Sequence, residues 1–126
     1  YNCLSFFEDI LFLCIKHKIQ MVIKLKRKYR NSSDLHPSYR NFLHKLKDDK
    51  NVFFIDPSTS PYPLIKSTTC SIAMPFTSTP IISNLMKKPV CYYDPNAYVS
   101  RTDAEARGVE IIIGIKELEN WIVNNI

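Results

Sequence analysis

The sequence contains very little glycine. Its 126 residues include only Gly108 and Gly114, so neither a Walker A phosphate-binding loop nor a GxGxxG dinucleotide-binding turn is present. The composition therefore argues against ordinary P-loop nucleoside triphosphatases and NAD-dependent dehydrogenases. Any phosphate-bearing ligand must be held by other means than a glycine-rich loop.

Paired cysteine motifs are also missing. The four cysteines, Cys3, Cys14, Cys70 and Cys91, form no CxxC pair and have no histidine at zinc-binding spacing. Cys70 and Cys91 fall in apolar segments, where a free cysteine behaves as a small buried hydrophobic residue. We expect reduced structural thiols, no bound metal and a cytoplasmic location, with the inner face of the membrane as an alternative.

No apolar run is long enough to span a bilayer. The most apolar stretch, Ile10 to Ile15, is far shorter than the roughly 20 residues that a transmembrane helix needs. The net charge is +5, and seven basic residues without an acidic one lie between Lys16 and Arg30. Such a block can hold phosphate or an anionic membrane surface, so peripheral membrane association stays open. No nucleic-acid-binding module is recognisable, and we expect no nucleic-acid partner.

The length and composition fit one globular domain. Hydrophobic residues make up 45% of the chain and charged residues 23%, which makes disorder the wrong reading. The chain starts with Tyr1 and opens into a helical pattern, whereas an α/β unit usually starts with a strand. We therefore expect residues 1–126 to be one domain taken from a larger protein.

Short apolar runs alternate with helical patterns along the chain. The expected strands are Met21–Leu25, Asn51–Ile55, Cys70–Met74, Pro89–Tyr93 and Val109–Ile113. The expected helices are Leu4–Lys18, Pro37–Lys47, Tyr62–Ser67, Pro80–Lys87 and Lys116–Asn124. Because the strands are continuous apolar runs, they are expected to be buried on both faces. The sequence predicts an α/β, Rossmann-like three-layer αβα fold with a mostly parallel sheet.

Two of the expected helices have apolar faces that identify core residues. In the first helix this face consists of Phe7, Ile10, Leu11, Cys14 and Ile15. In the last helix it consists of Leu118, Trp121 and Ile122.

Polar and basic residues follow four of the expected strands. In an open parallel sheet, ligands bind beyond the carboxyl ends of the strands, so these residues are candidates for one common site. They are Lys26 and Arg27, then Asp56 and Ser58, then Thr77, Ser78 and Thr79, and finally Tyr93 and Asp94.

The most informative of these segments is the one that ends at Pro80. Three hydroxyl residues follow a strand, and Pro80 suits the first position of the next helix, with Thr79 as its N-cap. The free N–H groups of a helix start can bind a phosphate. The alternative is that Ser78 and Thr79 only cap the helix.

The other candidates also have a plainer interpretation. Lys26 and Arg27 can bind phosphate, or they can belong to a charge run that only improves solubility. Asp56 and Asp94 each precede a proline and can simply shape turns. None of the three histidines stands where a catalytic triad would place it, so we expect the general base to lie outside this chain.

Several runs of residues are similar to one family of proteins. They are Asp56-Pro57-Ser58, Leu64 to Ser67, Ser71 to Thr79 with the sequence SIAMPFTST, Lys88-Pro89-Val90 and Tyr92-Tyr93-Asp94-Pro95. With Lys24 to Arg27 and Gly114 to Trp121, these runs resemble the C-terminal half of bacterial surface-carbohydrate (polysaccharide) biosynthesis proteins that look like GT-B-type glycosyltransferases. The most specific part is the MPFTST run, followed by Lys-Pro and Tyr-Tyr-Asp-Pro.

This resemblance implies two Rossmann-like domains that face a cleft, with this chain as the donor-binding one. It implies a nucleotide-sugar donor, no metal or other cofactor, and two further partners: the N-terminal domain of the same protein and a glycan or lipid-linked acceptor. By position, the donor phosphates would be bound by Thr77, Ser78 and Thr79 and neutralised by Lys26 and Arg27. The residues near the nucleotide or sugar would be Asp56, Ser58, Tyr93 and Asp94. Many such domains bind ribose through an acid in the following helix, and Pro80 to Asn84 contains none.

Two other classes stay open. One is a sugar-nucleotide epimerase or glycerophosphotransferase-like enzyme, which shares this architecture. The other is a non-catalytic, flavodoxin-like or receiver-like module that binds a partner. A receiver needs clustered acids at the end of its first strand, and here that strand ends in Lys26 and Arg27. We expect the chain on its own to bind rather than to catalyse.

Overall fold

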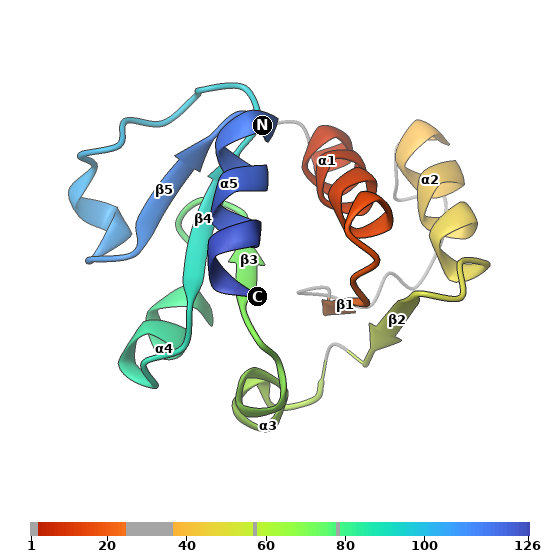
Figure 1. Cartoon of the computed structure of the whole chain (residues 1–126), viewed down its shortest axis with the longest axis horizontal. Helices are drawn as coiled ribbons and strands as arrows, with labels where there is room; N and C mark the ends of the chain where they lie inside the picture. The colour runs from red at the N-terminus through yellow and green to blue at the C-terminus, as the bar shows by residue number, and fades with distance from the viewer. Residues whose placement is uncertain (1–2, 25–36, 57, 78) are drawn as a thin grey trace. The chain divides into compact units, whose positions relative to one another are not determined.

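The chain consists of two compact units, each described here by itself. The computed structural model describes residues 3–24, 37–56, 58–77 and 79–126 (Figure 1). The N-terminal unit covers Asn2–Thr59 and the C-terminal unit covers Ser60–Ile126. The predicted Lys26 and Arg27 lie outside the described residues, as does Ser78.

The N-terminal unit contains two helices and two strands. They are α1 (Cys3–Lys16), β1 (Met21–Lys24), α2 (Pro37–Lys47) and β2 (Val52–Ile55). The two strands pair in parallel, with Met21 opposite Val52 and Lys24 opposite Ile55. Both helices contribute buried side chains to the core of this unit: Phe6, Phe7, Ile10 and Leu13 from α1, and Leu43 and Leu46 from α2.

The buried face of α1 differs from the predicted one. Phe7, Ile10 and Cys14 are buried as expected, but Ile15 is 58% exposed and Leu11 is only half-buried. Phe6 and Leu13 are buried instead. The helix is apolar on most of its circumference, so its periodicity alone does not determine which side faces the core.

The C-terminal unit is built around a three-stranded parallel sheet in the order β3-β4-β5. Its elements are α3 (Pro61–Ser67), β3 (Ser71–Ala73), α4 (Thr79–Leu85), β4 (Val90–Asp94), the 3-10 helix η2 (Ala104–Ala106), β5 (Glu110–Ile113) and α5 (Ile115–Asn125). All five residues of the central strand β4 are buried. On α5, Leu118, Trp121 and Ile122 are buried as predicted.

One face of this sheet positions the candidate site. The register places Ala73 beside Tyr92 and Tyr92 beside Ile111, and side chains at paired positions point to the same face. Phe76, from the loop after β3, and Ala106, from η2, pack onto the same hydrophobic cluster. We call this side of the sheet the Tyr92 face. The connection from β4 to β5 therefore returns to lie close to the loop after β3.

The predicted α/β class with parallel, Rossmann-like strands and intervening helices is confirmed. Every expected strand and helix is present, and no end differs from the predicted one by more than two residues. The described strands form two parallel sheets, a two-stranded one of β1 and β2 and a three-stranded one of β3, β4 and β5. That the whole chain acts as one nucleotide-sugar-binding domain stays a prediction.

Candidate functional site

A tight turn follows β3 and begins at Met74. The backbone N–H of Thr77 donates to the Met74 carbonyl at 3.4 Å, and the Thr77 hydroxyl donates to the same oxygen at 3.0 Å. Pro75 occupies the second position of this turn, and Phe76 occupies the third with φ of +67°. This is the pattern of a type II turn, in which the third position normally belongs to glycine.

Tyr92 holds this turn in place. Its hydroxyl donates to the Thr77 carbonyl at 2.6 Å, and its ring packs edge-on against the Phe76 ring with centroids 5.7 Å apart. A left-handed conformation costs a residue other than glycine roughly 1–2 kcal/mol. An aromatic pair contributes about 0.5–1.5 kcal/mol and a hydrogen bond about 1 kcal/mol, enough to offset that cost. Backbone strain of this kind is typical of ligand sites.

The Tyr92 hydroxyl keeps its proton and so remains a hydrogen-bond donor. Burial raises the pKa of Tyr92 above its ordinary value of 10.0, and the positive charge of Arg107 counteracts part of that rise. Arg107 is therefore close enough to act electrostatically on the residue that holds the turn.

The second wall of the site is the short helix η2. The Asp103 carboxylate caps it by accepting from the Glu105 N–H at 2.9 Å, and the Arg107 N–H donates to the Ala104 carbonyl at 3.2 Å. Arg107 closes the turn in the left-handed conformation, with φ of 49° and ψ of 44°. Ala106 is buried in the core, and the charged residues on either side of it, Glu105 and Arg107, are exposed.

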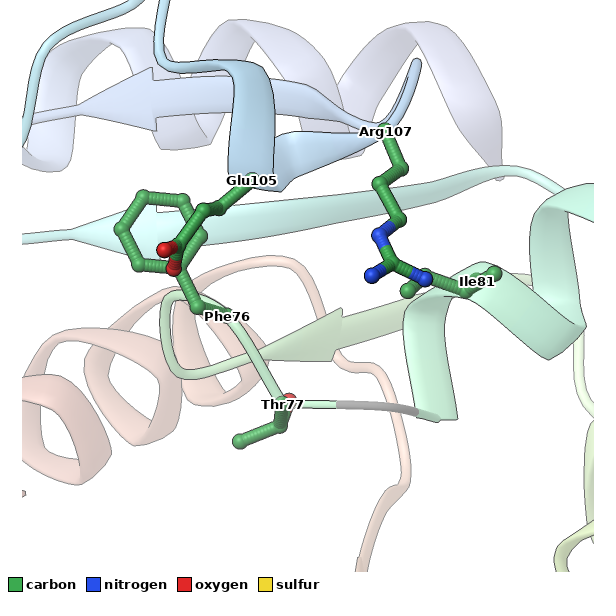
Figure 2. Close-up of a pocket in the computed structure, with 5 residues that line it drawn as sticks. All are labelled: Phe76, Thr77, Ile81, Glu105 and Arg107. Carbon is green, nitrogen blue, oxygen red and sulfur yellow. The ribbon is translucent and has the colours of Figure 1, made fainter.

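Between these two walls lies an open pocket with a volume of about 380 Å³. Its lining residues are Phe76, Thr77, Ile81, Glu105 and Arg107, and we call it the Phe76 pocket (Figure 2). The Glu105 carboxylate lies near the Phe76 ring, and the Arg107 guanidinium extends toward Ile81 (Figure 2). Within the described part of the chain, neither charged side chain has an ion pair or hydrogen bond.

The structure gives the three predicted hydroxyl residues different roles. Thr77 lines the Phe76 pocket, but its only O–H is donated to Met74. Thr79 was expected as the N-cap of α4 and is instead its first residue. The helix starts one residue early because proline is tolerated throughout the first turn. The Thr79 hydroxyl has no hydrogen-bond partner among the described residues.

Tyr93 and Asp94 are completely buried. The Asp94 carboxylate accepts from the N–H of Asn96 at 3.2 Å and from that of Val99 at 2.8 Å, which anchors the loop after β4. Asp94 thus shapes a turn, the plainer of its two interpretations. Its predicted closeness to a nucleotide or sugar stays a prediction, as does that of Tyr93.

Asp56 and Ser58 belong to the N-terminal unit. One carboxylate oxygen of Asp56 accepts from the Ser58 N–H at 2.9 Å and from the Ser58 hydroxyl at 2.8 Å. This local turn follows β2, and both residues are exposed. Their role near a ligand also stays a prediction.

Sequence reasoning missed Glu105 and Arg107. The sequence predicts no helix or strand between Tyr93 and Val109, although Asp103 before this turn and Gly108 after it are the usual signals of a capped helical turn. Those signals could have predicted the turn. They could not have shown that it lies opposite Phe76, because that depends on the path of the β4–β5 connection.

Cysteine chemistry does not contribute to the Phe76 pocket. The described cysteines Cys14, Cys70 and Cys91 are free thiols. Cys91 is fully buried, and desolvation strongly raises the pKa of its thiol. An inert thiol of this kind fits the predicted structural role.

The described residues contain neither a cluster of metal-ligating side chains nor a helix that could span a membrane. No group of three or more potential metal-ligating side chains comes together among them. Within the same residues, no helix has the length and apolar character required to cross a membrane.

The fold and the pocket define a class of protein. It is an α/β protein in which a Rossmann-like unit carries a small, partly apolar pocket, and the pocket is lined by a guanidinium and a carboxylate that are both unpaired among the described residues. The family described as polysaccharide biosynthesis PFTS motif protein matches residues 2–122, and the chain belongs to this family. Searches of the curated proteins and of the solved structures give no significant match.

Family membership supports the predicted role in polysaccharide biosynthesis. The family description names a PFTS motif, and the turn after β3 contains this motif as Pro75, Phe76, Thr77 and Ser78. Two of these four residues, Phe76 and Thr77, line the Phe76 pocket. The motif that names the family and the pocket therefore occupy the same place in the fold.

Proposed function

We propose that this chain is the nucleotide-sugar-binding half of a GT-B-type glycosyltransferase in polysaccharide biosynthesis. In this proposal the Phe76 pocket holds the phosphate-bearing part of the donor. The N-terminal domain of the same protein supplies the general base and the binding site for a glycan or lipid-linked acceptor. Membership of a polysaccharide biosynthesis family supports the role in polysaccharide biosynthesis, and the pocket with its guanidinium supports a phosphate-bearing ligand.

The observation that carries the proposal is the unpaired guanidinium of Arg107 beside the PFTS turn. A guanidinium can donate two parallel hydrogen bonds to phosphate, which gives both affinity and orientation. The helix α4 has only seven residues, so its dipole is small and the cation is the main attraction for an anion. The same charge would stabilise the diphosphate as it leaves the sugar.

Hydroxyl groups complete the proposed phosphate site. Thr79 has a free hydroxyl at the start of α4, and Ser78 precedes it in the sequence. Thr77 contributes by fixing the turn through its hydrogen bonds to Met74 and Tyr92. Lys26 and Arg27 keep their proposed role as neutralising charges on the sequence argument alone.

The first test is nucleotide binding by isothermal titration calorimetry, with UDP, CDP, GDP and CMP. We expect the chain to bind at least one of them, and Arg107→Ala to weaken that binding about 10- to 100-fold, the range for a charged hydrogen bond of about 1.5–3 kcal/mol. Lys116→Ala is the matched control, because it removes one positive charge from an exposed position on α5.

Two outcomes would contradict the proposal. One is that the full-length protein binds none of the four nucleotides at millimolar concentration. The other is that Arg107→Ala and Lys116→Ala bind with the same affinity as the unmodified chain. Release of the nucleoside diphosphate from a nucleotide-sugar, with sugar found on an acceptor, would separate a transferase from an epimerase.

A further inference from the structure

A leucine protrudes into solvent at the end of α4. Leu85 is 79% exposed, the largest value for any bulky hydrophobic side chain among the described residues. Tyr62, in the first turn of α3, is 56% exposed. The helices α3 and α4 lie in contact, and neither Leu85 nor Tyr62 lines the Phe76 pocket. The C-terminal unit therefore has an apolar surface for which the proposed phosphate site gives no use.

The backbone at the end of α4 is held in a fixed conformation. The N–H of Lys88 donates to the Ser83 carbonyl at 3.0 Å, and the N–H of Lys87 donates to the Asn84 carbonyl at 3.0 Å. This pair of bonds is the Schellman motif, in which a left-handed residue ends the helix. That residue is Lys87, with φ of 59°, at a position where glycine is usual. The protein thus carries a lysine next to Leu85 although the backbone there favours glycine.

The next lysine ties the end of α4 to the end of α3. Its Nζ atom donates to the carbonyl of Thr68, the C-cap residue of α3, at 3.3 Å. Both helix ends therefore lie at the amino ends of β3 and β4, whereas the PFTS turn follows the carboxyl end of β3 (Figure 1). We call the surface at these helix ends the Leu85 corner; its exposed residues are Tyr62, Lys66, Leu85 and Lys87.

The sequence around the Leu85 corner contains no acidic residue. Between Asp56 and Asp94 there are three lysines and no aspartate or glutamate. Glu110 starts β5 at the same end of the sheet, but β4 lies between β5 and β3. The corner thus combines protruding apolar side chains with positive charge.

This combination is complementary to an anionic lipid surface. A leucine side chain gains free energy when it enters the acyl region, and tyrosine prefers the level of the headgroups. Lysine is attracted by the negative charge of anionic lipids. A bilayer accommodates a protruding side chain without a preformed pocket, which a folded protein partner would have to provide.

From these observations we propose that the Leu85 corner docks the protein on an anionic lipid bilayer, with Leu85 inserted and Lys66 and Lys87 at the headgroups. The inference goes beyond the proposed function and does not rest on it. It assigns the membrane contact to a different part of the chain than the basic block from Lys16 to Arg30.

The experiment is co-sedimentation with vesicles at an ionic strength of about 0.15 M. One set of vesicles contains only phosphatidylcholine, and the other also contains the anionic lipid phosphatidylglycerol. We expect the chain to bind the anionic vesicles and to leave the neutral ones unbound. Binding should be lost at about 1 M salt, because the attraction between charges is then screened.

Three substitutions in the Leu85 corner should weaken this binding. Leu85→Ser should reduce the partition coefficient about tenfold, and Lys66→Ala and Lys87→Gly about fivefold each. Lys87→Gly also separates binding from folding. Glycine suits the left-handed conformation, so thermal unfolding should show no loss of stability in this variant.

Matched controls come from α5. Val123→Ser changes an apolar side chain that is 50% exposed, and Lys116→Ala removes one exposed positive charge. Both should bind the anionic vesicles as the unmodified chain does. Leu85→Trp gives a direct readout, since its fluorescence should shift to shorter wavelength on the vesicles while the buried Trp121 contributes a constant background.

Several results would overturn the inference. One is that the chain does not bind anionic vesicles, and another is that the corner variants bind no more weakly than the two controls. Loss of binding in the lysine variants but not in Leu85→Ser would indicate a soluble acidic partner. Dimerisation of the unmodified chain that Leu85→Ser abolishes, measured by analytical ultracentrifugation without lipid, would assign the corner to a second copy.

Discussion

The loop after β4 and the turn at η2 lie on the same polypeptide connection, but they use their charged residues in opposite ways. Asp94 is fully buried, and both of its oxygens accept hydrogen bonds from the loop that follows. Glu105 and Arg107 are exposed and unpaired among the described residues, and they line a pocket. A charged residue near a strand end thus indicates a ligand site only if its side chain forms no hydrogen bonds within the protein.

This comparison predicts a large loss of stability for Asp94→Ala. The substitution removes the acceptor of the Asn96 and Val99 N–H groups and leaves a void at a fully buried position, and we expect the free energy of unfolding to fall by about 3 kcal/mol. Urea unfolding followed by circular dichroism measures the change. Arg107→Ala, by contrast, should change stability by less than about 0.5 kcal/mol while it weakens nucleotide binding.

Asp94→Asn serves as the control for the anchoring role. It keeps the side-chain volume and one acceptor oxygen, so its stability should fall between those of the unmodified chain and Asp94→Ala. If Asp94→Ala unfolds at the same urea concentration as the unmodified chain, the contrast between the two charged regions is wrong.

A second prediction concerns the strained Phe76. Phe76→Ala removes the ring contact with Tyr92 but keeps a β-carbon in the left-handed conformation, whereas Phe76→Gly removes both the ring and the strain. We expect Phe76→Gly to be more stable than Phe76→Ala by about 1 kcal/mol, which is the reverse of the usual order for these residues. Thermal unfolding of the two variants measures the difference. If alanine proves the more stable, the turn is not strained at this position.

The smallest predicted effect involves an exposed ion pair outside the pocket. Arg101 pairs with both carboxylate oxygens of Glu117, which also accepts from the Ile113 N–H at 3.0 Å. The hydrogen bonds from Arg101 and then from Ile113 lower the pKa of Glu117 below its ordinary value of 4.5. A lowered folded-state pKa stabilises the fold above pH 4.5, and this contribution is lost as the pH falls through the folded-state value.

The measurement is urea unfolding between pH 6 and pH 3, roughly the range in which carboxylates titrate. Stability of the unmodified chain should fall slightly more steeply below pH 4.5 than that of Glu117→Gln, which has no group to titrate at this position. Parallel curves for the two proteins would show that the pair does not contribute to stability.

Sequence patterns predicted the elements well. The bounds of α2 agree with the prediction at both ends, and each strand was found because it is an apolar run limited by polar residues or proline. The face of α1 was harder to predict, because a helix that is apolar almost all round does not show which side the core will cover. In the pocket, the sequence located the PFTS segment at a strand end but did not reveal that Thr77 donates its hydroxyl to Met74.

The sequence by itself determined the α/β class and the place of the PFTS segment after a strand. Both follow from local features, namely the short apolar runs and the positions of the prolines, which can be read directly along the chain. Only the tertiary structure decided which charged side chains form hydrogen bonds within the protein and which do not. Asp94 accepts hydrogen bonds because the backbone of its own loop folds over it. Arg107 remains unpaired among the described residues because its neighbour Ala106 is buried in the core and the Arg107 side chain lies outside it. Both outcomes depend on how the connection between β4 and β5 folds back onto the Tyr92 face, which no single stretch of sequence specifies.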